Sequence, residues 1–183
     1  MNKLPREFYD RDTALVAREL LGKWIVHRVA GMDLIARIVE TEAYIGAQDK
    51  ASHSSKGLTE RTRVMFGPPG FAYVYLIYGR HHCVNVVTER AGIGAAVLIR
   101  AVEPVNDITD RTNGPGLLTR AMRITRDRNG CDLLSDGLFL TDPIQIETIH
   151  IIKTRRIGVD YAGAWAKRHL RFYIRGNKYV SRI

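Results

Sequence analysis

Glu42 is the residue best placed to do chemistry, because it lies near the end of a predicted strand over residues 34–44. Side chains alternate across a strand, so Glu42 shares one face with Tyr44 and with the apolar residues that precede it. A carboxylate on an apolar face is a candidate general base, since burial raises its proton affinity. The alternative is a rim glutamate paired with an arginine. Glu40 lies on the same predicted face and is a rival base.

Three tyrosines follow one another in the segment Tyr73-Val-Tyr-Leu-Ile-Tyr78-Gly79. Alternation places Tyr73 and Tyr75 on one face of a strand and Tyr78 on the other, beside a turn glycine. An aromatic side chain at a hairpin tip can insert between base steps and unstack DNA. The alternative is that all three rings simply pack against a sheet.

Histidines offer a second kind of chemistry. His53 lies in a polar loop over residues 46–70, and His81 and His82 are adjacent in a predicted strand, where neighbours point to opposite faces. The chain has neither an HExxH nor a CxxC pattern, so we expect no metal and no cofactor. A metal-dependent hydrolase that uses Glu42, His53 and His82 is the alternative that this hypothesis leaves open.

A glycine-rich turn, Gly114-Pro115-Gly116, opens a predicted helix that runs to about residue 124. Free amides and the helix dipole at such a start favour an anion such as a phosphate. The alternative reading is ordinary helix initiation.

The remaining pattern predicts the elements that would position these residues. An early helix is capped by Asp10 or Asp12 and ended by Gly22. Strands are expected over residues 23–29, 34–44, 72–78, 82–88, 95–102, 137–141 and 143–152. The first two form a hairpin across a turn at residues 30–33. The sum is an α+β fold, one domain over residues 1–183 with an antiparallel sheet and a few helices.

Composition limits the class of partner. The chain of 183 residues carries 28 Lys and Arg against 19 Asp and Glu, a net charge of +9, which suits a polyanionic partner. No apolar run is long enough for a membrane span, and the start lacks a signal core, so we expect a cytoplasmic protein. Cys83 and Cys131 favour reduced thiols over a disulfide.

Taken together, these segments resemble the alkyladenine (3-methyladenine) DNA glycosylase family. The resemblance runs in order over about residues 4 to 181. Its most specific parts are Glu40-Thr-Glu-Ala-Tyr44 and Tyr73-Val-Tyr-Leu-Ile-Tyr-Gly79. The other matching segments are 37–39, 45–46, 51–54, 65–66, 83–85, 97–104, 113–116, 156–159 and 170–173.

The resemblance implies a role for each matching residue. It implies that Glu42 is the general base, that Glu40 is structural, and that Tyr78 fills the gap left by a flipped nucleotide. The implied contacts with the damaged base and the nearby backbone are Tyr44, Ala51, His53, Tyr75, Asn85 and Arg100, with Asn85 screening against guanine's exocyclic amine and Arg100 beside the catalytic water.

The resemblance also implies the fold and the reaction. The expected fold is a mixed domain around a curved antiparallel sheet, without a helix-hairpin-helix motif. The expected partner is damaged double-stranded DNA, bound by a monomer that leaves an intact abasic site. Where family members often carry a lysine after the glycine-rich turn, this chain has Leu117, so Arg120 would have to join Gly114 and Gly116 at the DNA backbone. A nucleic-acid-binding module without catalysis remains the main alternative.

Overall fold

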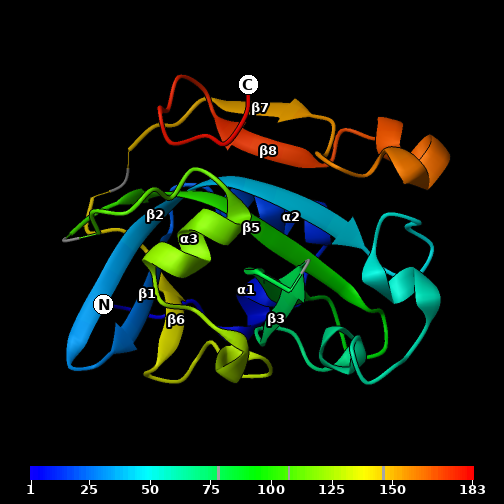
Figure 1. Ribbon diagram of the computed structural model, residues 1–183, viewed down its shortest axis with the longest axis horizontal. Helices are drawn as coiled ribbons and strands as arrows, with labels where there is room; N and C mark the ends of the chain where they lie inside the picture. The colour runs from blue at the N-terminus through cyan, green and yellow to red at the C-terminus, as the bar shows by residue number, and fades with distance from the viewer. Residues whose placement is uncertain (78, 107, 146) are drawn as a thin grey trace.

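The structure is a computed structural model, and it describes residues 1–77, 79–106, 108–145 and 147–183. The predicted α+β fold around a curved antiparallel sheet is confirmed (Figure 1). Its elements in chain order are α1 (Arg6–Tyr9), α2 (Thr13–Glu19), β1 (Trp24–Val29), β2 (Met32–Ile45), η1 (His53–Lys56), η2 (Arg63–Phe66), β3 (Ala72–Ile77), β4 (His81–Thr88), β5 (Ala95–Pro104), α3 (Pro115–Ala121), η3 (Arg126–Arg128), β6 (Leu138–Thr141), β7 (Ile151–Thr154), η4 (Asp160–Lys167) and β8 (Arg171–Ile174), where η marks a 3-10 helix.

The sheet is built from antiparallel neighbours in the order β3-β4-β5-β2-β1-β6. The predicted hairpin of β1 and β2 forms because Ala30 and Gly31 both adopt positive φ, 51° and 75°, as a tight hairpin turn requires. Strand β8 pairs with β7 on one side and with residues 40–42 of β2 on the other. The C-terminal part of the chain is therefore joined to the middle of the longest strand.

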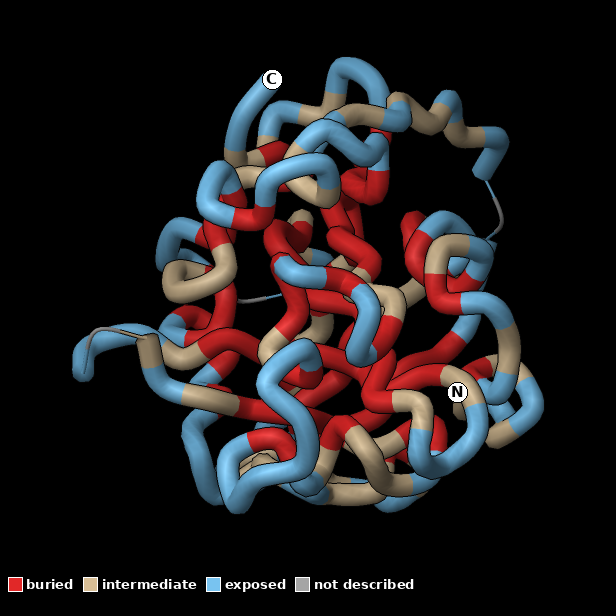
Figure 2. The backbone as a smooth tube through the Cα atoms, turned by 90° about the vertical axis from the view of Figure 1, so that its right-hand side faces the viewer, coloured by how far each residue is buried: buried red, intermediate tan, exposed pale blue. Residues whose placement is uncertain are grey.

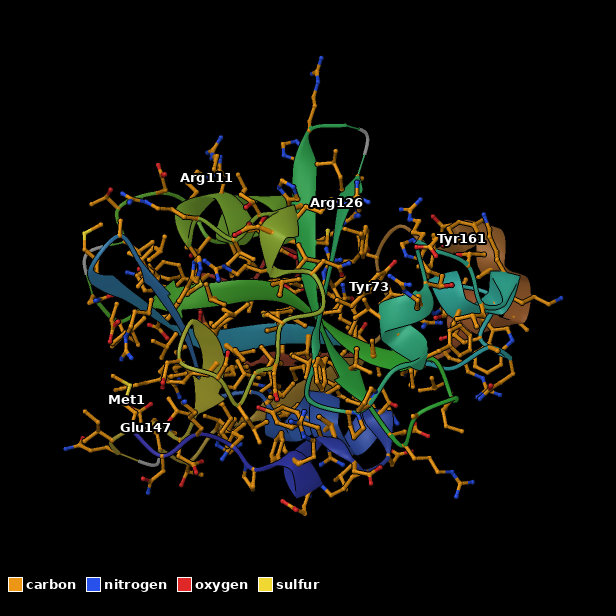
Figure 3. The ribbon with its side chains drawn as sticks, turned by 90° about the horizontal axis from the view of Figure 1, so that it is seen from below. Met1, Tyr73, Arg111, Arg126, Glu147 and Tyr161 are labelled. Atoms are coloured by element: carbon orange, nitrogen blue, oxygen red, sulfur yellow. The ribbon has the colours of Figure 1, made fainter. Side chains whose placement is uncertain are left out.

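Helices cover the two faces of the sheet differently. Helix α2 packs against β2, where the hydroxyl of Thr41 donates to the carbonyl of Ala17 at 2.8 Å, and α3 packs against β4 and β5. Figure 3 shows α3 on one side of the sheet and α2 on the other. Figure 2 shows the buried parts of the chain gathered in the interior, with exposed segments around them. The candidate functional residues share the face opposite α2 with helix α3.

The helix boundaries refine the prediction. Asp12, and not Asp10, caps α2, since its carboxylate accepts the amide of Leu15 at 2.8 Å. Gly22 follows that helix with φ of 86°, which suits glycine. Helix α3 ends at Ala121, three residues earlier than predicted. The polar loop at 46–70 contains η1 and η2, which the polar composition did not predict.

One predicted strand begins in the wrong place. We expected a strand over residues 143–152, but among the described residues of this range, 143–145 and 147–152, only the last two belong to a strand, the start of β7. Residues 143–145 and 147–150 lie in a connection, and Ile144 in this connection is 83% exposed. The reason is topological: β6 pairs with β1 at one edge of the sheet, whereas β7 pairs with β8 beyond β2. The chain must cross between these places before it can pair again.

Candidate active site

The candidate site is a cavity of about 430 Å³ on the face of the sheet opposite α2. Its walls come from the end of β2, from the middle of β5, from β3 and β4, from the start of α3, and from the loops that contain η1, η2 and η4. Figure 3 shows Tyr73 of β3 and Tyr161 of η4 among these elements. The lining residues are Tyr44, Ala51, Ser52, His53, Arg61, Met65, Tyr73, Tyr75, Leu76, Ile77, Cys83, Asn85, Leu98, Arg100, Pro115, Ile157, Gly158, Val159 and Tyr161.

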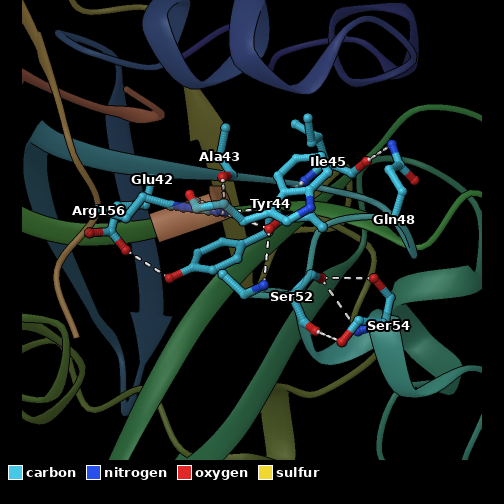
Figure 4. Close-up of polar contacts among 12 residues, drawn as sticks. Glu42, Ala43, Tyr44, Ile45, Gln48, Ser52, Ser54 and Arg156 are labelled. Carbon is cyan, nitrogen blue, oxygen red and sulfur yellow. Dashed lines mark hydrogen bonds and ion pairs between the residues drawn. The ribbon is translucent and has the colours of Figure 1, made fainter. Parts of the chain in front are cut away.

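Glu42 is fully buried directly behind this lining. One carboxylate oxygen accepts the hydroxyl of Tyr44 at 2.8 Å (Figure 4), and the other accepts the backbone amide of Ile157 at 2.8 Å. A guanidinium nitrogen of Arg100 lies 3.4 Å from the second oxygen. The shared face that alternation predicted for Glu42 and Tyr44 is therefore confirmed. Since all three partners line the cavity, the carboxylate is held in a fixed orientation beside it.

Glu40 is also fully buried, but its surroundings differ. One of its oxygens accepts from Arg100 at 3.0 Å, from Arg171 at 2.8 Å and from the hydroxyl of Ser181 at 3.0 Å. The other oxygen accepts the amide of Ser181 at 2.6 Å. These four donor groups belong to three residues, of which Arg171 and Ser181 lie outside the cavity lining. Glu40 thus joins β2, β5 and the C-terminal segment.

Arg100 lies between the two carboxylates. Burial alone would lower the pKa of its guanidinium, but attraction to Glu42 and Glu40 outweighs this effect and raises that pKa. The arginine therefore stays charged, and it balances part of the negative charge that two buried carboxylates bring to the site. The alternative interpretation, a rim glutamate paired with an arginine, is therefore correct about the arginine. It differs in position, because Glu42 is buried beside a cavity and not exposed at a rim.

Aromatic rings form one wall of the cavity. The rings of Tyr73 and Tyr75 lie with centroids 5.2 Å apart, which confirms that they share a face. His53 meets Tyr75 edge-on at 4.5 Å, and its Nδ1 lies 3.0 Å from the Tyr73 hydroxyl. Burial, together with the charges of Arg61 and Lys56, lowers the pKa of His53 to about 4. The imidazole is therefore neutral at pH 7.

Polar groups of the predicted pocket are oriented by protein partners. The side-chain amide nitrogen of Asn85 donates to the carbonyl of Tyr73 at 2.9 Å. Burial and the nearby Glu42 raise the pKa of Tyr44 well above its ordinary value, so its phenol stays a hydrogen-bond donor. The amide of Ala51 donates to Asp49 at 3.0 Å, and its carbonyl accepts from Tyr161 at 3.3 Å. Both backbone groups of Ala51 are thus already engaged.

The glycine-rich turn lies at the edge of the cavity, which only Pro115 reaches. A Cβ on Gly116 would stand 2.8 Å from the Cβ of His81, so this glycine is required for close packing of α3 on the hairpin. Gly114 has an extended φ of 169°, which any residue adopts. Arg120 is exposed at the end of α3. The predicted wedge, Tyr78, lies outside the described residues.

Sequence reasoning missed four residues of the site. Asp49 and Arg156 form a fully buried ion pair, Ile157 binds Glu42 through its amide, and Tyr161 covers Ala51. Arg156 and Ile157 lie in a segment that the family resemblance covered, but the resemblance carried no role for them. Backbone donors and pairs far apart in sequence leave no signal in spacing.

Neither a metal-binding cluster nor a membrane-spanning helix occurs among the described residues. Across residues 1–77, 79–106, 108–145 and 147–183, no three His, Cys, Asp or Glu side chains come together as a metal site would require. Over the same residues no helix combines the length and apolar character that crossing a membrane needs. Cys83 and Cys131 are both free thiols.

Comparison with known proteins places this arrangement in a class. The sequence pattern of the family described as methylpurine-DNA glycosylase (MPG) matches residues 7–178. A relative from Legionella pneumophila (strain Corby) is 59% identical over the whole of both chains. One from Anaeromyxobacter sp. (strain Fw109-5) is 56% identical over 98% of this chain and 93% of its own. One from Myxococcus xanthus (strain DK1622) is 52% identical over 100% of this chain and 95% of its own.

All three relatives are named, provisionally, as 3-methyladenine DNA glycosylases. The fold and the site therefore belong to an enzyme of DNA repair that acts on a base. More specifically, the chain belongs to the methylpurine-DNA glycosylase family, and the resemblance found in its sequence is confirmed. Membership in this family implies a DNA substrate.

Proposed function

We propose that this protein flips alkylated or deaminated purines out of duplex DNA and hydrolyses their N-glycosidic bond with a water molecule that Glu42 activates. The observation that carries the proposal is the position of Glu42, a buried carboxylate held by Tyr44, Ile157 and Arg100 beside an aromatic cavity. A base inside a duplex hides its glycosidic bond, so the nucleotide must leave the stack before this carboxylate can act.

The cavity walls suit a damaged purine. Tyr44 and Tyr75 offer aromatic faces, and a cationic ring stacked on such a face gains about 0.5–2 kcal/mol per contact. N-alkylation makes some purines cationic and improves them as leaving groups, so these lesions need little acid catalysis. His53 adds a third ring, neutral at pH 7, so it does not repel a cationic base.

The carboxylate of Glu42 has two tasks in this mechanism. Departure of the base gives the sugar an oxocarbenium-like character, which a nearby negative charge stabilises. The same carboxylate accepts the proton of the attacking water. Arg100, within 3.4 Å of Glu42, is placed to hold that water and the backbone of the lesion. Among the described lining residues none is a lysine, which supports a reaction that stops at an abasic site.

Other residues complete the proposed contacts with DNA. Asn85, fixed by Tyr73, screens purines against the exocyclic amine of guanine. Gly114, Gly116 and Arg120 contact the DNA backbone beside the cavity. Because both backbone groups of Ala51 have protein partners, the neighbouring peptide of His53 is left to bind the edge of the base.

The proposal is tested with duplexes that each contain one defined lesion: 3-methyladenine, 7-methylguanine, hypoxanthine or ethenoadenine. We expect release of at least one of these bases and abasic sites that break only after alkali or an endonuclease is added. Activity in excess chelator is also expected. Undamaged duplex is the control. No base release from the entire set, with tight binding to all of them, would favour the binding module over the enzyme.

Tyr78 is proposed to fill the gap that the flipped nucleotide leaves. Replacement of Tyr78 by serine removes the ring that stacks in this gap, and the loss of one base–aromatic contact corresponds to about 1–3 kcal/mol. We therefore expect affinity for lesion duplex at physiological salt to fall by about tenfold or more, measured by fluorescence anisotropy. The control is Ile144→Ser, which removes an exposed apolar side chain outside the cavity lining and should leave the affinity unchanged. Equal affinities for Tyr78→Ser and wild type would refute the wedge.

A further inference from the structure

The strongest unassigned feature is the ion pair of Asp49 and Arg156. Both side chains are fully buried, and Arg156 Nη2 donates to Asp49 Oδ1 at 2.9 Å while Nη1 donates to Oδ2. Asp49 lies in the loop before η1, and Arg156 lies between β7 and η4. Burying two charges carries a desolvation penalty that apolar residues of similar volume would avoid. We therefore expect this buried pair to have a role that depends on directed hydrogen bonds, which apolar residues could not supply.

Directed hydrogen bonds are what the pair supplies. Arg156 also donates to the carbonyl of Ala43 at 2.9 Å and to that of Trp165 at 3.3 Å. Asp49 accepts the amide of Ala51 at 3.0 Å and that of Ile45 at 3.3 Å. The pair thus fastens three segments to one another: the end of β2, the loop that forms the base pocket, and the chain that enters η4.

Both close hydrogen-bond donors to Glu42 lie on segments that this pair fastens. The guanidinium of Arg156 lies 4.8 Å from the centroid of the Tyr44 ring, whose hydroxyl donates to Glu42 (Figure 4). Ile157, whose amide donates to the other oxygen of Glu42, is the next residue in the chain. A shift of Arg156 would therefore move both groups that orient the carboxylate.

We propose that Asp49 and Arg156 are positioning residues that couple the lesion pocket to Glu42. The pair sets the Tyr44 ring and the Ile157 amide at the distances that hold the carboxylate toward the cavity, and it fixes Ala51 in the pocket wall through the same Asp49. The inference rests on the proposed role of Glu42 as the general base. It predicts that the pair affects the chemical step more than the binding of DNA.

The test uses Asp49→Asn, which keeps the shape of the side chain, and Arg156→Lys, which keeps the charge but not the forked geometry. We expect the single-turnover rate constant for base release to fall about 10- to 100-fold in each, since small misplacements of a catalytic group have effects of this size. Affinity for a duplex that carries a tetrahydrofuran abasic-site analogue should stay within about twofold. Asp33→Asn, which disrupts the exposed forked pair of Arg28 and Asp33, is the matched control and should change neither quantity.

A double-mutant cycle with Tyr44→Phe shows whether the pair acts through Glu42. Tyr44→Phe removes one hydrogen-bond donor to Glu42. The rate constant of the double variant Tyr44→Phe/Asp49→Asn should therefore fall by less than the product of the two single fold-losses. Wild-type rates in both Asp49→Asn and Arg156→Lys would overturn the inference, as would a parallel loss of excision and abasic-analogue binding. If Asp49→Asn fails to fold, Arg156→Lys decides alone. Failure of the wild type to release any base would instead reject the proposed function.

Discussion

Replacement of Glu42 by glutamine should give a folded protein that binds lesion duplex and releases its base about 10²- to 10⁴-fold more slowly than wild type. The range is that of a general base in a proton transfer. Glutamine has the size of glutamate, and its carbonyl oxygen can still accept the amide of Ile157 and face Arg100. Tyr44 can turn its hydroxyl to accept a hydrogen bond from the new amide, because a phenol both donates and accepts.

The measurement is single-turnover release of 7-methylguanine or hypoxanthine at saturating enzyme, with affinity measured separately. Glu103→Gln is the matched control, since Glu103 also lies on a strand and pairs with an arginine, Arg37, away from the cavity. It should release the base at the wild-type rate. Excision by Glu42→Gln at a rate near that of wild type would remove Glu42 from the mechanism.

Sequence patterns could predict the parts of this site that depend on neighbouring residues. Alternation along a strand was enough to place Glu42 beside Tyr44 and Tyr73 beside Tyr75, because both pairs lie two residues apart. The hairpin turn was likewise predictable from local sequence. Alternation could not separate Glu40 from Glu42, since it assigns both to one face, and both contact Arg100.

The parts that sequence could not predict depend on pairing over long distances. Asp49 and Arg156 lie 107 residues apart, and Glu40 and Ser181 lie 141 apart. The segment around each of these residues, taken alone, has the composition of an ordinary loop or tail. The strand wrongly expected to begin at residue 143 has the same origin, because β6 pairs with β1 at one edge of the sheet whereas β7 pairs with β8 beyond β2. Local pattern predicts which faces are apolar, whereas topology decides what those faces meet.

The same substitution at Glu40 should lower the stability of the protein more than it lowers the rate of base release. Glu40→Gln removes the charge that two buried arginines, Arg100 and Arg171, share, and it places an amide among four donors. Loss of one partner from a buried ion pair destabilises a protein by about 3–5 kcal/mol. For a chain of this size we expect the melting temperature to fall by about 6–20 °C, since 1 kcal/mol corresponds to about 2–4 °C.

Thermal unfolding followed by circular dichroism measures this effect, with Glu60→Gln as the control. Glu60 lies 88% exposed and 3.7 Å from Arg63, so its loss should change stability by less than about 0.5 kcal/mol. Below its melting temperature, Glu40→Gln should retain more excision than Glu42→Gln, because two of the three residues that bind Glu40 lie outside the cavity lining and Arg100 still pairs with Glu42. A stable Glu40→Gln without activity, beside an active Glu42→Gln, would exchange the two roles. The pair of variants therefore separates a carboxylate that holds the fold from one that acts on the substrate.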